Sequence, residues 1–487
     1  MEHFILTEKE QQVFKLCSAL LNKDHGVMSF EEISQEISLS KTTINYAIEK
    51  LRDILAQVLG EGQYSLVKTS DTLYLEFAHS VSFQMLKNAY ISDSFFLYFF
   101  QEVYHERFSC LMSVTDVKFI SYETGKKKLV SCKQYLKHFS LGLCMKKKVT
   151  DLICGEEKQV RFMFFCMILS KFQSKCHVFF ESENPKLTLF LDNMMKAFPY
   201  ILPSSYLKLK IFYRIALDRI EKGHLLPDDM VFPDYCDYPG LSLAVFSEKV
   251  APLFADIALT AQQKKIEVEF FYFLFSTLIF QPSDILEQLE YQSQTCKTFE
   301  IFYQTVKQVS GMTFTKSDKR FMSYAHRQCM VWHQMFHVSF SFQHLFTEQK
   351  RFMDRNSRYM LLWHRITAAL QDYPVYQELF LEHPNMPFFL QRIFNAISFS
   401  KEIPCKVFLL CYSPITQSIA MANLKNRNLT IQVDFVNSLK EADIVISELA
   451  LENRENVNPF ICFVDTPFNK RDWKNIENLI IRWRESL

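Results

Sequence analysis

The chain has 487 residues, which predicts roughly two to five domains, and its hydrophobic fraction of 48% excludes a disordered chain. The formal net charge is +1, so the molecule is not a polycation, and any nucleic-acid or membrane surface must be a local patch. With 9 glycines and no GxGxxG or GxxxxGK[ST] motif, the sequence also excludes a glycine-rich phosphate loop.

Cysteine usage and apolar runs indicate the compartment. The 13 cysteines are odd in number and include no CxxC pair, which favours a reducing cytosol and no zinc site. The N-terminus lacks a signal-peptide apolar region, and the longest apolar run, Phe270 to Phe280, is too short to span a bilayer. We therefore expect a cytoplasmic protein without a membrane partner. Because no nucleophile and base are paired specifically enough to indicate hydrolysis, we expect neither an enzyme nor a cofactor.

The first 78 residues predict three helices followed by a two-stranded wing. Leu6 to Asn22 is amphipathic, and Ser29 with Glu32 forms a capping box at the start of a short second helix. Ser40 caps the third helix, and the alternating segments QYSLV and TLYLEF predict a hairpin. This order is typical of a winged helix-turn-helix.

The third helix carries candidate DNA contacts. Its inward stripe consists of Ile44, Ile48, Leu51 and Leu55. The side chains predicted to point away, and to contact bases, are Lys41, Thr42, Asn45 and Tyr46. Asparagine can form two hydrogen bonds with adenine, and a helix N-terminus favours phosphate. Residues 1–77 hold 7 Lys/Arg against 12 Asp/Glu, a net charge of −5, so a protein contact surface is the alternative.

Residues 120–136 repeat the pattern of residues 39–55 at low identity. In this alignment Ser40 corresponds to Ser121, and the inward stripe corresponds to Gly125, Leu129, Cys132 and Leu136. A second helix-turn-helix is therefore predicted over residues 79–153, and Gly125 would permit close helix approach. Residues 78–150 hold 11 Lys/Arg against 5 Asp/Glu, a net charge of +6. Candidate DNA contacts are Tyr122, Lys126, Lys127 and Lys128, while a solvated helix face is the alternative.

The remaining chain predicts a long helical region and then a small α/β domain. Helical patterns extend from about residue 154 to about residue 400, and Pro282 and Ser283 mark a break into two halves. From Ile403 onward, the segments KVFLLC, TIQVDFV, ADIVIS and FICFVD read as strands, and RDWKNIENLIIRWRE reads as a closing helix. This alternation indicates a mostly parallel sheet. The fold class is thus mostly α and multidomain, with a C-terminal α/β domain.

The order of these parts resembles the Mga/AtxA/RofA-like stand-alone virulence regulators, with the RofA-like branch most similar. The motifs that carry this resemblance are LSKTTINYAIEKL, ISYETGKKKL, GEEKQVRF with LSKF close behind, RIEKGH and ADIVIS. The resemblance implies two helix-turn-helix units (1–78 and 79–153) and two helical domains similar to phosphotransferase-system regulatory domains (154–283 and 284–400). It also implies a C-terminal domain similar to a IIB component (401–487). It further implies promoter DNA as partner, control of surface and virulence genes, and a homodimer that involves the C-terminal half.

Relatives with such domains can be modified on histidine, and two histidines qualify here. His224 follows RIEKG and His364 lies in LLWHRI, one in each helical half, so phosphotransferase-system phosphocarriers are possible partners. An ordinary core or surface histidine is the alternative at each position. His333 and His337 have metal-ligand spacing but no third ligand in view, which favours core packing. Cys411 ends a predicted strand, where IIB-like proteins carry a phosphorylated cysteine, but no glycine shapes an anion site there.

Two other functional classes stay open from the sequence. The first is a phosphotransferase-linked phosphocarrier or protein-interaction module whose N-terminal helices do not bind DNA; phosphate on Cys411 without DNA affinity would favour it. The second is RNA antitermination, which is disfavoured because the N-terminus predicts winged helices and not an RNA-binding sheet.

Overall fold

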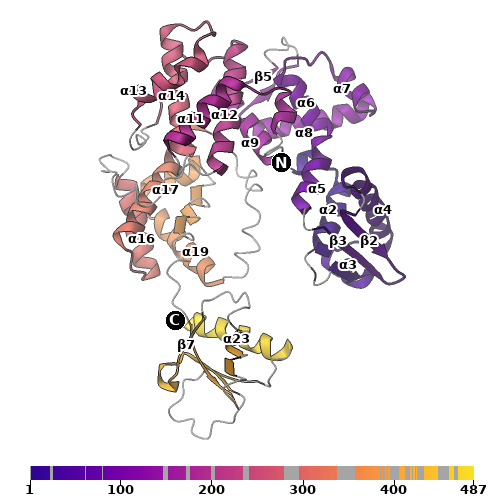
Figure 1. Cartoon of the computed structure of the whole chain (residues 1–487), viewed down its shortest axis with the longest axis vertical. Helices are drawn as coiled ribbons and strands as arrows, with labels where there is room; N and C mark the ends of the chain where they lie inside the picture. Colours follow the sequence, from indigo (N-terminus) through magenta and orange to yellow (C-terminus); the bar gives the residue numbers. More distant parts are fainter. Residues whose placement is uncertain are drawn as a thin grey trace. The chain divides into compact units, whose positions relative to one another are not determined.

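A computed structural model describes most of the chain as two compact units, which are treated separately (Figure 1). The first unit comprises residues 1–299, 323–348 and 377–387, and the second comprises 300–322, 349–376 and 388–487. The described residues are 2–21, 23, 26–60, 62–78, 81–145, 152–171, 176–198, 203–233, 241–278, 296–336, 357–383, 386–387, 390–391, 393–394, 405–411, 417–418, 420–422, 424, 433–447, 460–464 and 470–486.

The N-terminal segment forms the predicted helices and wing, drawn in indigo in Figure 1. Its elements are α1 (Glu2–Ile5), α2 (Glu8–Leu21), β1 (Val27–Ser29), α3 (Phe30–Ile37), α4 (Lys41–Val58), β2 (Tyr64–Lys68) and β3 (Thr72–Phe77). The strands form an antiparallel sheet in the order β1-β3-β2, so the predicted two-stranded wing gains a third strand. Both reciprocal hydrogen bonds of the Ser29–Glu32 capping box are present, as predicted.

The second helix-turn-helix is also present. Its elements are α5 (Phe83–Ser92), α6 (Phe95–Tyr104), α7 (Leu111–Val117), α8 (Tyr122–Lys137), β4 (Gly142–Leu143) and β5 (Ile153–Cys154), followed by α9 (Glu157–Lys171). The predicted inward stripe of α8 is buried throughout. The first helix of the chain, α1, packs against α8, where the Phe4 ring lies 5.2 Å from the His138 ring and 6.1 Å from the Tyr135 ring. The N-terminal residues therefore contribute to the core of the second helix-turn-helix.

Gly125 permits the close approach of α7 and α8. A Cβ atom at this position would overlap the Thr115 methyl group, which is itself buried. The Thr115 hydroxyl donates a hydrogen bond of 2.8 Å to the Met112 carbonyl, which limits its freedom to rotate away. Glycine lowers the intrinsic stability of α8, but it allows α7 and α8 to pack closely at this position.

Helices continue through the rest of the first unit. They are α10 (Cys176–Phe180), α11 (Pro185–Ala197), α12 (Pro203–Glu221), α13 (Leu243–Val250), η4 (Ala251–Phe254) and α14 (Ala261–Leu278). Gly223, which has φ +85°, follows the end of α12 in a C-terminal cap, where the N–H groups of Gly223 and His224 donate to the carbonyls of Ile220 and Arg219. The predicted break at Pro282 and Ser283 lies outside the described residues.

More helices follow in the described residues, and residues from 405 onward form an α/β domain within the second unit. The helices are α16 (Cys296–Ser310), α17 (Lys316–Met335), α19 (Ser357–Gln371) and α20 (Pro374–Glu382). The α/β domain has β6 (Cys405–Leu410), β7 (Val433–Phe435), η7 (Leu439–Glu441), β8 (Ile444–Ser447), β9 (Ile461–Phe463) and α23 (Lys470–Ser486). The described strands are all parallel, in the order β7-β6-β8-β9, which confirms the predicted parallel sheet.

A buried charge cluster joins three helices of the first unit. The Arg161 side chain on α9 is fully buried, and its guanidinium forms two hydrogen bonds of 2.6 and 2.8 Å with the Glu267 carboxylate on α14. It also donates to Glu157 at 3.0 Å and to the His224 carbonyl at 3.0 Å, while Arg219 on α12 binds Glu157 at 2.5 and 2.9 Å. Burial alone would lower the pKa of Arg161, but the charges and hydrogen bonds of Glu267 and Glu157 raise it overall.

No helix in the described part of the chain is both long enough and apolar enough to cross a bilayer.

Replacing Gly125 with Ala should destabilise the second helix-turn-helix, although Ala is the better helix former. The gain in helix propensity is about 1 kcal/mol, whereas forcing a methyl group into the packed α7–α8 contact costs about 1–3 kcal/mol. Thermal unfolding of the full chain, with hydrogen exchange of the α7 and α8 amides, measures the change.

The matched control for Gly125→Ala is the same substitution combined with Thr115→Ser, which removes the overlapping methyl group and keeps the hydroxyl. In that background Gly125→Ala should stabilise the protein by about 1 kcal/mol. A stabilising effect of Gly125→Ala in the original chain would show that the contact is not tight.

Replacing Glu267 with Gln should destabilise the packing of α9, α12 and α14 by about 3–5 kcal/mol, because Arg161 stays buried without its main counter-charge. Hydrogen exchange of these three helices in the full chain reports the loss. The double variant Arg161→Met with Glu267→Met should recover part of it, since neither charge is left buried. If Glu267→Gln leaves exchange unchanged, the cluster does not hold these helices together.

Candidate nucleic-acid interface

The two helix-turn-helix units share the same turn, as the alignment of the two segments predicted. Ser40 accepts a hydrogen bond of 3.3 Å from the Thr43 N–H, and Ser121 accepts one of 3.2 Å from the Thr124 N–H. The residue two positions before each cap has a left-handed backbone, with φ 53° at Ser38 and φ 49° at Phe119. The repeat of the sequence pattern is therefore also a repeat of backbone geometry, and α4 and α8 are the corresponding presented helices.

The predicted lysines of α8 occupy different environments. Lys126 and Lys127 are exposed, while Lys128 is half-buried. The Lys126 ammonium binds the Glu123 carboxylate at 2.8 Å and lies 4.7 Å from the centre of the Tyr122 ring. The hydrogen bond from Lys126 to Glu123 raises the pKa of this lysine, so it stays charged.

Lys128 is half-buried, and its charge acts on Glu10 of α2. Burial raises the pKa of the nearby Glu10 carboxyl, but hydrogen bonds from the Tyr90 hydroxyl and from Thr7, with the charge of Lys128, lower it overall. The Tyr90 hydroxyl donates to Glu10 at 2.5 Å and so joins α5 to α2. Lys128 therefore contributes less to an exposed basic surface than the sequence predicted.

Two further exposed lysines, Lys133 and Lys137, continue the basic face of α8 beyond the predicted residues. The sequence places three more, Lys146, Lys147 and Lys148, after β4, but they lie outside the described residues. The exposed cations of α8 thus extend along most of its length, outside the buried stripe.

The predicted base contacts of α4 are exposed but already have neighbours. Thr42, Asn45 and Tyr46 are exposed, whereas the Lys41 side chain lies outside the described part of the structure. The Lys68 ammonium on β2 donates a hydrogen bond of 2.9 Å to the Asn45 amide oxygen. The Lys9 ammonium lies 5.2 Å from the centre of the Tyr46 ring. Two cations therefore adjoin the candidate base contacts, although the unit as a whole is acidic.

Lys68 and Lys9 were missed by reasoning from the sequence. Lys68 ends the first wing strand, so a basic residue at a wing tip was an available signal. Lys9 is a surface residue of α2, and nothing in the local sequence indicates that it reaches α4. Part of the negative charge of the unit lies on α3, where the carboxylates of Glu32 and Glu36 lie 3.9 and 3.5 Å from the Lys23 ammonium.

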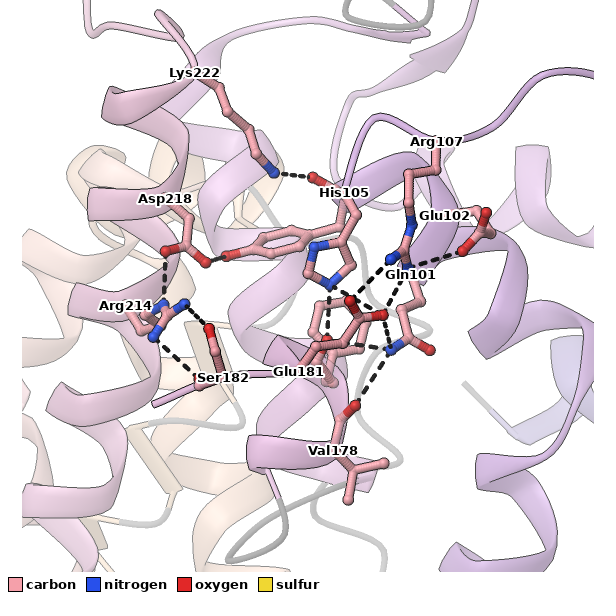
Figure 2. A network of polar contacts seen from close by, with 12 residues as sticks. Gln101, Glu102, His105, Arg107, Val178, Glu181, Ser182, Arg214, Asp218 and Lys222 are labelled. Carbon is pink, nitrogen blue, oxygen red and sulfur yellow. Dashed lines mark hydrogen bonds and ion pairs between the residues drawn. The ribbon is translucent and has the colours of Figure 1, made fainter. Parts of the chain in front are cut away.

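A polar network joins the second helix-turn-helix to the helical region behind it (Figure 2). The Tyr104 hydroxyl at the end of α6 donates to the Asp218 carboxylate on α12 at 2.7 Å, and the Lys222 ammonium donates to the Tyr104 carbonyl at 2.5 Å. Burial raises the pKa of Tyr104 well above its ordinary value, and the charge of Asp218 adds to this. Arg107, just after α6, binds the Glu181 carboxylate at 2.6 and 2.8 Å, and this bond lowers the pKa of Glu181.

His224 belongs to the same junction. Its Nε2 atom lies 2.7 Å from the Glu106 carboxylate, in the loop between α6 and α7. Because a carboxylate only accepts, the Nε2 N–H donates this hydrogen bond. Glu106 has φ 60°, a left-handed conformation that holds its side chain at this place. The other candidate, His364, is exposed on α19 in the second unit.

The structure describes part of the sites that the remaining cysteine and histidine hypotheses name. Cys144 and Cys154 form a disulfide with a Cα–Cα distance of 6.3 Å, which differs from the expected reduced cysteines. The pairing of β4 with β5 brings the two cysteines together. They are ten residues apart in the sequence, so a search for CxxC pairs does not find them. Cys411 is half-buried after β6, and the helix expected to start near Pro414 lies mostly outside the described residues. His333 is buried as expected, while His337 lies outside the described residues. The described residues contain no group of three or more His, Cys, Asp or Glu that could hold a metal ion.

Comparison with known proteins agrees with this geometry. No curated protein sequence matches the chain. Residues 79–167 match the family model of the Mga helix-turn-helix domain, a range that includes α5 to α8 and most of α9 with Arg161. The match supports a regulator of the Mga family and indicates a DNA-binding transcriptional regulator.

Proposed function

We propose that this protein is a sequence-specific transcriptional regulator of surface and virulence genes, in which both helix-turn-helix units contact double-stranded promoter DNA. The observation that carries the proposal is the row of exposed lysines on α8. It lies directly after a helix-turn-helix turn and within the residues that match the Mga helix-turn-helix domain. Exposed lysines on a presented helix neutralise phosphates and release counterions, which favours DNA association.

The two units are proposed to contribute differently to DNA binding. Lysine is a flexible point charge that suits phosphates better than bidentate base recognition, so Lys126 and Lys127 supply affinity. On α4, Asn45 has the amide chemistry that recognises adenine. Its amide oxygen accepts a hydrogen bond from Lys68 in the free protein, and Lys68 would bind a DNA phosphate instead in the complex. The target genes and the RofA-like branch rest on the resemblance alone, while self-association through the C-terminal half rests on the resemblance and on the apolar content of residues 401–487.

Phosphotransferase-system modification is the proposed regulation of this activity, with His224 as the responsive residue. Of the two candidate histidines, His224 is bonded to the helix-turn-helix through Glu106. A phosphoryl group on His224 adds close to two negative charges. That charge would repel the Glu106 carboxylate and disturb the loop that leads into α7. The His224–Glu106 contact would then have two states, hydrogen-bonded and repelled, and would link the helical region to DNA binding.

Replacing Lys126, Lys127 and Lys128 with Ala should weaken binding to specific and random duplexes alike. The slope of log K against log salt should decrease by about 1 for each phosphate that the variant no longer neutralises. Asn45→Ala should instead reduce discrimination between the two duplexes by about 1–3 kcal/mol. Filter binding of the full chain across a salt series measures both.

The matched control for the triple substitution replaces Lys249, Lys264 and Lys265, which are exposed on α13 and α14, with Ala. It removes the same net charge outside the helix-turn-helix units and should leave the salt slope unchanged. If the α8 variant also keeps its slope, its lysines only face solvent. Absence of DNA affinity in the unmodified chain would favour the phosphocarrier alternative.

Replacing His224 with Asp should change DNA affinity by roughly 5- to 150-fold, the range of ordinary coupling free energies of about 1–3 kcal/mol. The new carboxylate repels Glu106, so adding Glu106→Gln should restore most of the affinity. Incubation with the general phosphotransferase proteins, followed by mass spectrometry without acid, should locate the phosphoryl group on His224. Label confined to Cys411, or no label, would contradict this regulation.

A further inference from the structure

The solvent-facing stripe of α8 contains an apolar residue in a row of cations. Tyr122, Lys126, Val130, Lys133 and Lys137 are spaced by three or four residues, so they share one face of the helix. All five are exposed, whereas Gly125, Leu129, Cys132 and Leu136 of the same helix are buried. Val130 lies at the centre of the exposed face with 53% of its surface accessible.

Val130 has no structural role that explains its place. A β-branched residue is a weaker helix former than the lysines around it, and here it gains little from burial. The corresponding residue of α4 is Glu49, which binds Arg52 at 2.8 Å, so this position of the motif accommodates a charged side chain. The two units therefore present different chemistry at the same place.

A second apolar side chain stands at the turn that precedes α8. Phe119 is 96% exposed, and its backbone is left-handed at φ 49°. That conformation is unfavourable for a bulky residue, and the corresponding Ser38 adopts it with a small polar side chain. Exposing a phenyl ring there adds no burial that would offset the strain.

Duplex DNA is the partner whose chemistry matches this surface. Lysines on both sides of Val130 are complementary to phosphates, and α8 contains a single acidic residue, Glu123, which Lys126 neutralises. The major groove presents an apolar group on its floor, the C5-methyl of thymine, between two phosphate backbones. An apolar residue flanked by cations on a presented helix has the same arrangement.

We propose that Val130 is a specificity-determining residue that contacts the C5-methyl group of a thymine in the major groove, and that Phe119 makes a second apolar contact at the edge of that groove. This inference rests on the proposed function. It assigns base recognition to α8 in addition to α4, with the lysines positioning the helix and Val130 reading one base.

The first step of the test is to select duplexes from a random-sequence pool with the full chain. Each thymine of the selected site is then replaced by deoxyuridine, which lacks only the methyl group. One replacement should weaken binding by about fourfold, the factor for one methyl-sized group. In Val130→Ala that replacement should have no effect, while replacements elsewhere act as before.

Two further variants distinguish a loss of the thymine contact from a general effect of the substitution on the fold. Val245→Ala removes the same atoms from a helical valine that is 43% exposed on α13, and it should retain every thymine dependence. Phe119→Ser introduces the residue that the first unit uses in this backbone conformation, and it should weaken binding while the Val130-dependent thymine keeps its effect.

The outcomes separate the two proposals. If the full chain binds no duplex, the proposed function fails, and this inference fails with it. If the chain binds DNA but no selected sequence emerges, the sequence-specific part of the proposed function fails together with this inference. If a sequence is selected but every deoxyuridine effect persists in Val130→Ala, only the reading by Val130 is overturned.

Discussion

The buried guanidinium of Arg161 is the interaction on which the first unit depends. A charge removed from water is tolerated only when it is paired and fully hydrogen-bonded, and here Glu267, Glu157 and a backbone carbonyl supply those bonds. These partners come from α9, α14 and the chain after α12, so the charge fixes how three elements meet. Since α9 is also part of the range that matches the Mga helix-turn-helix domain, the same pairing anchors the candidate DNA interface.

This anchoring has a functional consequence. A helix-turn-helix on a flexible linker would not sense its neighbours, whereas this one is joined to α12 by Tyr104 and Asp218 and by Glu106 and His224. Figure 2 shows Lys222 and Asp218 of this junction. These short, directional bonds connect the helical region to α6 and to the loop before α7, so they are the contacts through which the proposed regulation would act.

The sequence by itself determined the local structure of both helix-turn-helix units. Capping by Ser29, Ser40 and Ser121 uses atoms within three residues, and the buried stripe of α8 follows from helical periodicity, so both are readable from the chain. The parallel C-terminal sheet was predictable for the same reason, because each apolar strand is a local pattern. The motif with Arg161 was recognised only as part of the resemblance, with no role for the arginine, and His224 was a candidate only through that resemblance.

Only the tertiary structure decided which distant groups meet. Arg161 and Glu267 are separated by 106 residues, and Glu106 and His224 by 118, so no local pattern relates them. The same holds for Lys68 beside Asn45 and for the disulfide that β4 and β5 bring together. These contacts depend on how helices and strands pack. A buried charge or polar group is costly without a partner, so packing must bring a partner to it. The exposure of Val130 and Phe119 was also decided there, because exposure depends on what the rest of the fold leaves uncovered.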